Sequence, residues 1–540
     1  MVTRGTTRRP DGVRTDGVRR PFERTRLPLF STAAPLVVGL VGSLAILAGS
    51  LGVGFLPLDS PIRSWPLIAA LRASTGATEL SVVAVVAGGM LLLVAWLRLR
   101  AVALDDRPGS VRAILVAALA WAAPLLLAVP LFSRDMFSYV AQGRLMVAGV
   151  DPYTSGTATL PGWYALGVDP LWANTPTPYG PLYLLAEQTA VHVAGWSSPE
   201  FSIALLRALS VAGVAVSAVY ALRLARLRGL SVPLTAWTLV ANPLTLVLFV
   251  VAGHNDSVMV ALILASLYYG HTDRRVAAVL LMGAAIAVKP VAVIALPVLA
   301  LLWLRHDESL RRRIRTWAWT GAGALAVVVA IGLAAGVGVG WIGAMVVPGS
   351  ILHWYAPMSA VTVAVSTAVQ LTGHDPAAAI AVVKVLALAG AGAIATALML
   401  TKRAIDPLAR LTGALLAFVT ASTAIHPWYA LWILPIAALS RPWRSTHRHL
   451  AVYATIFLMC VTLAEPVDGA GGAVDQIPVR VATIAAIVVI GVYVLAGYSE
   501  EEAVDVRRLV RAVPFGSEVL QRLSGGRLGA PLPLRVPARK

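Results

Sequence analysis

The segment 133–139 reads Ser-Arg-Asp-Met-Phe-Ser-Tyr and places a carboxylate, Asp135, directly after a strongly apolar stretch. A carboxylate at a membrane boundary is costly when it faces hydrocarbon, so Asp135 should face a cavity or a partner group. The pattern leaves two interpretations open. Asp135 either forms a local surface ion pair with Arg134 or accepts a proton in a catalytic site.

The side chains that follow Asp135 are of the kinds that bind carbohydrates. Aromatic rings stack on sugar faces, and carboxylate, amide and guanidinium groups form hydrogen bonds with hydroxyls. Aromatic residues also anchor proteins at membrane interfaces, so the pattern by itself does not separate the two roles. The substrate-binding candidates in this part of the chain are Arg134, Tyr139, Gln142, Arg144, Asp151, Tyr153 and Tyr179.

Lys289 lies inside the apolar stretch 276–304, where an ammonium group is costly unless an anion compensates it. We expect Lys289 to bind an anionic group of a substrate electrostatically. The alternative is a lysine at a helix end whose side chain extends to the membrane interface.

Two histidine segments, 254–256 and 426–429, supply further polar candidates. The HxxxH and HExxH spacings of zinc sites are absent, so we expect no bound metal and assign these groups to hydrogen bonding with sugar or phosphate. A metal site and helix capping are the alternatives. Trp354 and Tyr355, near His353, either line a sugar or lipid groove or belong to an aromatic belt. The candidates here are His254, Asn255, Asp256, His426, Trp428 and Tyr429.

The composition excludes a water-soluble globular protein, because 58% of the 540 residues are hydrophobic and only 13% are charged. Lipid forces the backbone of a crossing segment to form its own hydrogen bonds, which favours helices. We therefore expect an all-α membrane protein, a polytopic helix bundle with about 13 or 14 crossings. The apolar stretches lie at about 33–55, 80–98, 112–131, 203–223, 233–252, 256–270, 276–304, 317–340, 377–400, 408–425, 428–440, 449–465 and 478–497.

The net charge of +18 comes from arginines in tails and short loops, where charge fixes orientation, and we do not expect nucleic-acid binding. This distribution predicts a multi-pass plasma-membrane protein. Basic cytoplasmic tails at 1–30 and 499–540 would flank a membrane domain at 31–498, and the segment 132–202 would lie outside.

The stretch 276–304 carries basic residues at both ends, which a hairpin with Lys289-Pro290 at its turn would place on one side. Proline removes a backbone donor and suits such a reversal. One long kinked helix is the alternative. The same reasoning predicts that 357–372 is re-entrant or interfacial, and that the polar clusters share the outer face.

The segment 133–143, continued by 149–153, resembles a family of actinobacterial membrane enzymes. These are the polyprenol-phosphomannose-dependent α-1,6-mannosyltransferases that build the mannan core of lipomannan, members of the GT-C glycosyltransferases. The resemblance extends through 179–181, 254–256, 289–290 and 426–429 and so covers most of the membrane region. It implies a GT-C-type bundle with a long first extracytoplasmic catalytic loop. It also implies that an acidic residue in that loop is the general base, and Asp135 is the matching position.

The resemblance further implies an inverting transfer of mannose at the outer face of the membrane. The donor would be polyprenyl-phosphate mannose and the acceptor a lipid-linked, growing α-1,6-mannan of the lipomannan type, with membrane lipids as surroundings and no cofactor. An arabinosyltransferase or a branching mannosyltransferase is the alternative within this chemistry. A transporter or flippase would show internal pseudo-symmetry and charges at the membrane midplane, and no repeat is evident in the sequence.

Overall fold

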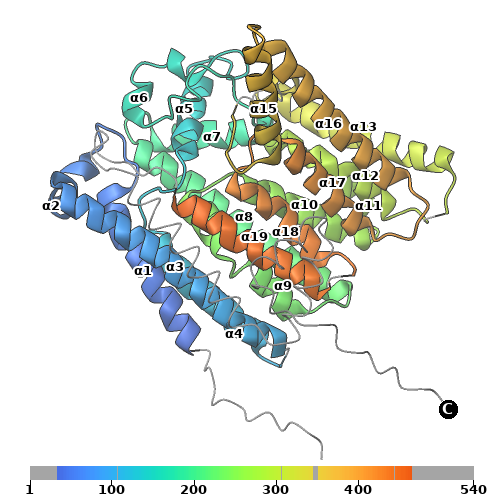
Figure 1. The fold of residues 1–540 in the computed structure, drawn as a ribbon, viewed down its shortest axis with the longest axis horizontal. Helices are drawn as coiled ribbons and strands as arrows, with labels where there is room; N and C mark the ends of the chain where they lie inside the picture. Colours follow the sequence, from blue (N-terminus) through green and yellow to red (C-terminus); the bar gives the residue numbers. More distant parts are fainter. Residues whose placement is uncertain (1–32, 106, 306, 345–350, 443, 465–540) are drawn as a thin grey trace, which may run out of the picture.

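The computed structural model describes residues 33–105, 107–305, 307–344, 351–442 and 444–464. Throughout these ranges the regular secondary structure is helical, as Figure 1 shows, and the expectation of an all-α polytopic membrane protein is confirmed. The two expected tails and the expected crossing at 478–497 lie outside the described residues.

Five of the described helices are each long and apolar enough to cross a membrane. A sixth crossing results if the π-helix Thr245–Val251 and α10 (Asp256–His271), which meet at 113°, form one broken span. The five long helices are α1 (Ala33–Val53), α3 (Thr75–Asp105), α8 (Pro199–Leu227), α13 (Leu310–Ala334) and α16 (Ala377–Leu400).

The sequence-based count of crossings is higher because it treated shorter apolar helices as full spans. A 14-residue helix is about 21 Å long, which is less than the hydrocarbon thickness of about 30 Å. Proline breaks several of these stretches, since it cannot donate a backbone hydrogen bond. The stretch 233–252, for example, divides at Asn242-Pro243 into α9 (Val232–Leu239) and the π-helix. The shorter apolar helices include α4 (Ser110–Leu125), α15 (Pro357–Leu371), α17 (Pro407–Ala421) and α18 (Ala430–Leu439).

The helices α1, α3 and α4 pack together into a layer at one side of the molecule (Figure 1). Glycines permit the close approach of α1 and α3, because a Cβ atom added to Gly42 would lie 2.6 Å from the carbonyl oxygen of Gly88. Trp96 and Trp237 join this layer to α9: their rings stack at 4.4 Å, and each indole nitrogen donates to the other's backbone carbonyl.

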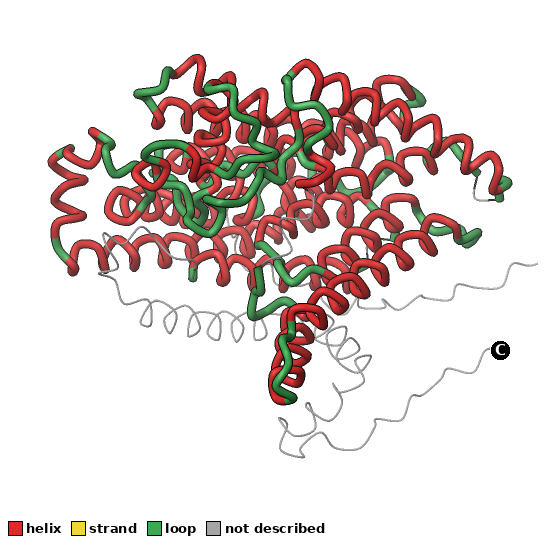
Figure 2. Tube along the Cα trace, turned by 90° about the horizontal axis from the view of Figure 1, so that it is seen from above, coloured by secondary structure: helices red, strands yellow, loops and turns green. Residues whose placement is uncertain are grey.

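The segment 132–202, which we expect to be a long extracytoplasmic loop, includes both helices and irregular segments. It contains α5 (Asp135–Val147), α6 (Trp163–Leu166) and α7 (Pro181–Ala194). Viewed from the side of α5 and α6, loop segments gather over the helix bundle (Figure 2). The helices α5 and α7 approach closely at Gly143. A Cβ atom added to Gly143 would lie only 2.5 Å from the carbonyl oxygen of Glu187.

The predicted reversal at Lys289-Pro290 is confirmed. The helix α11 (Arg275–Val288) ends there, and the chain returns through the 3₁₀ turn Pro290–Ala295 and α12 (Leu296–Leu301). Its two ends lie together, because the Arg275 guanidinium is 5.4 Å from the ring centroid of Trp303 and the Trp303 indole donates to the carbonyl of Gly270.

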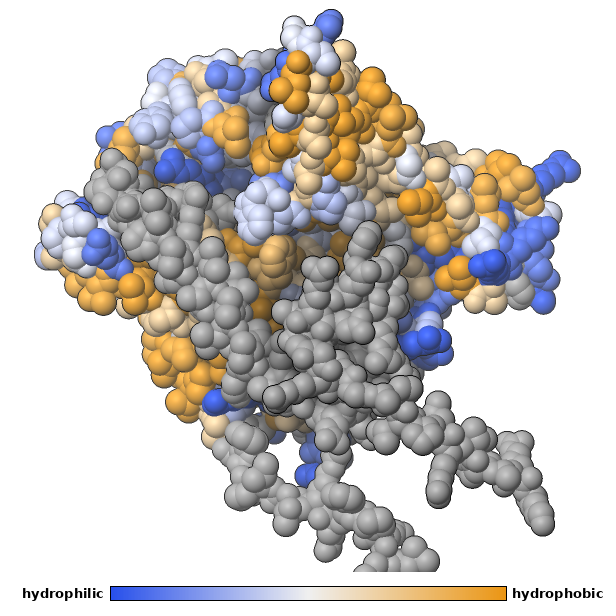
Figure 3. All heavy atoms as spheres, in the orientation of Figure 1, coloured by the Kyte–Doolittle hydropathy of each residue, from blue (hydrophilic) through white to orange (hydrophobic). Residues whose placement is uncertain are grey.

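The segment expected to be re-entrant forms α15, which packs on α16 and keeps most of its side chains exposed. In Figure 3 hydrophobic side chains cover the long helices at lower left and upper right, whereas hydrophilic ones gather over the α5–α6 corner and at the far right end. The helix α19 (Ser445–Leu463) packs against α3 and α18.

Candidate active site

Asp135, the first residue of α5, meets the junction between the π-helix and α10. Its Oδ2 lies 3.2 Å from Nδ1 of His254. The same oxygen accepts hydrogen bonds from the hydroxyls of Tyr179 (3.4 Å) and Tyr139 (3.5 Å). The Asp135 side chain is 15% exposed, so part of it remains accessible to solvent.

The sharp bend before α10 requires a glycine. Gly253 has φ of +67°, in the left-handed region, and a Cβ atom there would lie 2.6 Å from the sulfur of Met136. The bend turns His254 toward Asp135 and leaves Asn255 fully buried. The backbone N–H of Asn255 donates to the Tyr139 hydroxyl at 3.4 Å, which orients that hydroxyl toward Asp135.

The electrostatic environment keeps Asp135 ionised. Burial alone would raise the pKa of this carboxyl, but the interaction with His254 and the positive charge of Lys289 outweigh burial and lower its pKa to about 2. At neutral pH, Asp135 is therefore a carboxylate that can accept a proton.

A second charged pair lies close by. Asp256 is fully buried, and its Oδ1 accepts hydrogen bonds from Nζ of Lys289 and from the indole nitrogen of Trp432, both at 2.7 Å. The Lys289 ammonium also lies 5.5 Å from the ring centroid of Tyr179 and 5.4 Å from that of Trp432. Asp256 is thus the anionic partner that Lys289 needs in its apolar surroundings. An ammonium has three donors, so Lys289 retains capacity for a further anion.

A stack of rings borders Asp135 on the side of His254. The indole of Trp428 lies between two imidazoles, with ring centroids 3.9 Å from His254 and 4.2 Å from His426. Burial lowers the pKa of His426 to about 3, so this imidazole is neutral at physiological pH. Tyr429 stacks on Trp432 at 4.0 Å and thereby joins this stack to the Lys289 pair.

Several predicted residues position the site without reaching Asp135. The Asp151 carboxylate accepts from the backbone N–H of Tyr153, and the Tyr153 hydroxyl donates to the Tyr179 carbonyl at 2.8 Å. The side-chain oxygen of Gln142 accepts from the Thr177 hydroxyl at 3.0 Å. These contacts fix the segment that carries Tyr179.

The two arginines predicted near Asp135 have other neighbours. The Arg134 guanidinium lies 4.8 Å from the ring centroid of Phe55. Arg144 donates to the backbone carbonyl of Trp196, and its guanidinium is 4.8 Å from that indole ring. The structure therefore groups Asp135 with the tyrosines, the histidines and Lys289, whereas Arg144 belongs to a contact between α5 and the turn before α8.

Sequence reasoning missed two residues of α8 that hold the site together. The buried Arg207 donates to the carbonyls of Leu126, Ala128 and Val251, at 3.3, 2.5 and 3.0 Å. One turn later the Ser210 hydroxyl contacts the carbonyl of His254 at 3.1 Å. The sequence did contain an indication of this role, because Arg207 lies within the apolar stretch 203–223, where a charged side chain is costly unless it has polar partners.

Glu187 and Trp432 were also missed. Glu187 is fully buried on α7, and burial raises the pKa of its carboxyl well above the usual range. Trp432 follows Trp428 by four residues, a spacing that places both indoles on one helical face.

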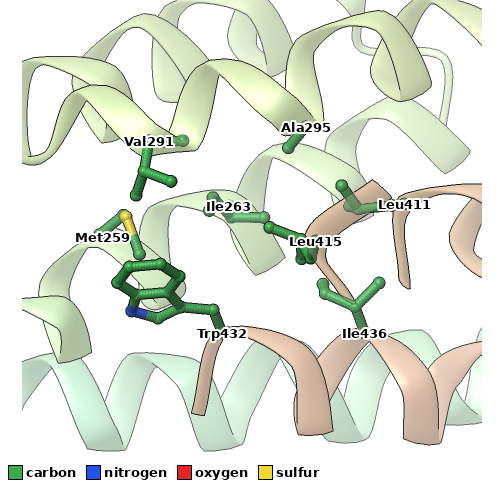
Figure 4. A pocket seen from close by; sticks show the side chains of 9 residues that line it. Met259, Ile263, Val291, Ala295, Leu411, Leu415, Trp432 and Ile436 are labelled. Atoms are coloured by element: carbon green, nitrogen blue, oxygen red, sulfur yellow. The ribbon is translucent and has the colours of Figure 1, made fainter. Parts of the chain in front are cut away.

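An apolar pocket opens beside the Lys289 pair. Trp432 is shared between the two features, since its indole nitrogen bonds Asp256 while its ring lines the pocket (Figure 4). The chain reaches the pocket two residues after Lys289, at Val291. The lining residues are Met259, Ile263, Val291, Ala292, Ala295, Leu411, Leu415, Trp432 and Ile436.

In the part of the chain that the structure describes, no three histidine, cysteine, aspartate or glutamate side chains converge as a metal site would require. Asp135 and His254 meet as a pair.

Comparison with known proteins gives two family matches. Residues 36–305 match the model described as "Alpha-(1->6)-mannopyranosyltransferase, N-terminal domain", and residues 355–495 match the "MptB C-terminal domain". The chain is 32% identical over 482 residues to alpha-(1->6)-mannopyranosyltransferase A of Mycobacterium tuberculosis, an alignment that covers 87% of this chain and 90% of that protein. It is 37% identical over 183 residues to the Corynebacterium glutamicum protein of the same name, which covers 34% of this chain and 37% of that protein. No solved structure matches the chain.

Proposed function

Since this chain belongs to the alpha-(1->6)-mannopyranosyltransferase family, we propose that it transfers mannose from polyprenyl-phosphate mannose to a growing α-1,6-mannan of the lipomannan type. The reaction takes place at the outer face of the plasma membrane and inverts the anomeric carbon. The observation that carries the proposal is the ionised Asp135, held between His254 and two tyrosine hydroxyls beside a lysine and an apolar pocket.

Asp135 is the general base of this reaction. The acceptor hydroxyl attacks the anomeric carbon, its proton passes to Asp135, and the bond between that carbon and the phosphate oxygen breaks. The three side-chain contacts of Asp135 fall on Oδ2, so we assign proton acceptance to Oδ1. A carboxylate of low pKa is a weak base for a free hydroxyl. The hydroxyl becomes acidic as its bond to carbon forms, so the proton moves late in the step.

Lys289 stabilises the departing phosphate. The leaving group is an anion without being protonated, so the site needs a positive charge and no general acid. Asp256 holds the ammonium in place through one of its donors. The remaining donors bind phosphate oxygens.

The apolar pocket suits the hydrocarbon of the donor. It begins two residues after Lys289 and is lined by aliphatic side chains and by the ring of Trp432. A polyprenyl chain attached to a phosphate at Lys289 would meet these apolar side chains first. Burial of such apolar surface contributes binding free energy in proportion to its area.

The test is transfer of labelled mannose from polyprenyl-phosphate mannose in membranes that contain the full chain. Asp135→Asn should lower the rate by about 10²- to 10⁴-fold, the usual contribution of a positioned base. Asp169→Asn is the matched control, because Asp169 lies in the same 132–202 segment and accepts a local bond from the N–H of Leu171. Full transfer by a normally inserted Asp135→Asn variant would reject the assignment, and transfer of arabinose instead of mannose would reject the donor.

A further inference from the structure

Six side-chain rings form a continuous path from the protein surface to Asp135, and we call them the ring series. They are Trp354, Tyr355, His353, His426, Trp428 and His254. Successive ring centroids are 5.4 Å apart from Trp354 to Tyr355, 5.3 Å from Tyr355 to His353, 4.6 Å from His353 to His426 and 4.2 Å from His426 to Trp428. Trp428 then stacks on His254, which contacts Asp135.

The ring series passes from exposed to buried surroundings. Trp354 is 80% exposed, whereas His353, His426 and Trp428 are half-buried and His254 is fully buried. A tryptophan exposed to this degree contributes little to packing, so its ring face is available to a ligand.

The outer end of the ring series is tied to the segment that leads into the site. The backbone N–H of His353 donates to the Thr423 carbonyl at 3.0 Å, and its Nδ1 contacts the Ile425 carbonyl at the same distance. The Tyr355 hydroxyl donates to that same Ile425 carbonyl at 2.5 Å. These bonds of its two neighbours hold the backbone around Trp354 against the segment before His426.

Inversion places the two substrates on opposite sides of the reacting carbon. Under the proposed function, the donor phosphate lies at Lys289 and its lipid lies against the apolar side chains near Trp432. The nucleophile must then approach the reacting carbon from the side opposite the phosphate. His254 contacts Asp135 and stacks on Trp428, so a saccharide bound along these rings would bring its hydroxyl to the base.

We infer that the ring series is the binding subsite for the acceptor saccharide, with Trp354 as the stacking platform for a mannose ring remote from the reacting hydroxyl. This inference rests on the proposed function. Aromatic faces pack against the C–H groups of a pyranose, and the imidazoles of His353 and His426 form hydrogen bonds with its hydroxyls. A path of several rings accommodates several sugar units, which suits an acceptor that is an oligosaccharide.

The experiment measures both Michaelis constants of the full-length protein, with polyprenyl-phosphate mannose as donor and a soluble α-1,6-linked mannotriose as acceptor. Trp354→Ala should raise the acceptor KM by about 5- to 10-fold, the range expected for one lost aromatic contact. The donor KM and the kcat at saturating acceptor should stay at their wild-type values, and Trp354→Phe should restore most of the affinity. Trp65→Ala is the matched control, because Trp65 is 58% exposed and lies at the start of α2 (Pro66–Ala73), outside the ring series.

Binding of the same mannotriose, followed by saturation-transfer NMR on the purified protein, separates the two hypotheses. Suppose that the wild-type protein binds mannotriose, that Trp354→Ala weakens this binding, and that the wild type transfers no mannose. This result would overturn the proposed function and leave the subsite standing. An unchanged acceptor KM in an active Trp354→Ala variant would overturn the subsite. A raised donor KM with unchanged acceptor KM would also overturn it, since the ring series would then contact the lipid donor.

Discussion

Lys289 and Asp256 form a buried ion pair at 2.7 Å, although 33 residues separate them in the chain. Asp256 is fully buried and Lys289 is 15% exposed, so the carboxylate anchors the pair and the ammonium faces the site. This arrangement holds a lysine at a fixed place in an apolar bundle and leaves it donors for a second anion.

Replacement of Lys289 by Met should abolish transfer and also destabilise the protein. Removal of one partner leaves a buried charge uncompensated, at a cost of about 3–5 kcal/mol. The double variant Lys289→Met with Asp256→Asn removes both charges and should recover most of the stability while transfer stays at least about 100-fold low. Thermal unfolding and mannose transfer, measured on both variants, check this. Normal transfer by the double variant would exclude Lys289 from the reaction.

The pH dependence of activity should reflect the low pKa of Asp135. With a pKa of about 2, this carboxylate stays ionised across the physiological range, so its titration should not reduce kcat/KM between about pH 5 and 8. His254→Ala removes the hydrogen bond and the charge of His254, which together lower this pKa most. Burial, which raises the pKa of Asp135, remains in the variant. The acid limb of the kcat/KM profile should therefore move to higher pH in the variant. Coincident profiles would show that His254 does not govern the ionisation of Asp135.

The same low pKa has a consequence for stability at acid pH. A carboxyl whose pKa is lower in the folded than in the unfolded protein stabilises the fold above the unfolded value of about 3.9. That contribution is lost as the pH falls through about 2. Comparison of unfolding in detergent at about pH 5 and about pH 3 should show a smaller acid-induced loss for Asp135→Asn than for wild type. An equal loss in both proteins would argue against the low pKa.

Arg207 should be a positioning residue whose loss affects both rate and stability. Arg207→Gln leaves backbone carbonyls from two segments without their cationic donor, which should lower the free energy of unfolding by about 2–4 kcal/mol. Because those segments lead to Asp135 and His254, kcat should fall more than the donor affinity, and Arg207→Lys should restore part of the rate. Arg226→Gln, an exposed arginine on the same helix, is the control and should behave as wild type. A variant with wild-type kcat and reduced stability would show that Arg207 is only structural.

Gly253→Ala should disrupt the junction that presents His254. Its φ of +67° is strained for alanine by about 1–2 kcal/mol, and the added Cβ atom would meet the Met136 sulfur. Gly321→Ala is the control, because a Cβ atom there meets nothing within 4 Å. Stability and transfer should both fall for Gly253→Ala and neither for the control. Wild-type transfer by Gly253→Ala would show that the bend is not needed to place His254.

The length and apolarity of segments such as 377–400, which forms α16, were sufficient to predict an all-helical membrane protein. Proline chemistry was sufficient to predict the reversal at Lys289-Pro290, because a missing backbone donor acts locally. In the described part of the chain, five helices, or six with the broken span, are long enough to cross, which is fewer than the apolar stretches there suggested, because apolarity does not show where a short helix ends inside the bundle. The helices within 132–202 were missed for a related reason: α5 and α7 stabilise each other by packing across Gly143.

Sequence alone determined that Asp135 and Lys289 are expensive charges that need partners, since the cost of a charge in an apolar stretch depends only on its surroundings in the chain. It also determined the family, through the residues around Asp135. Only the tertiary structure decided which partners these charges have. His254 reaches Asp135 because a 113° bend and the bonds from α8 turn it inward, and Asp256 reaches Lys289 because two distant helices pack together. Such pairings depend on how helices cross in space, which the order of residues along one helix does not specify.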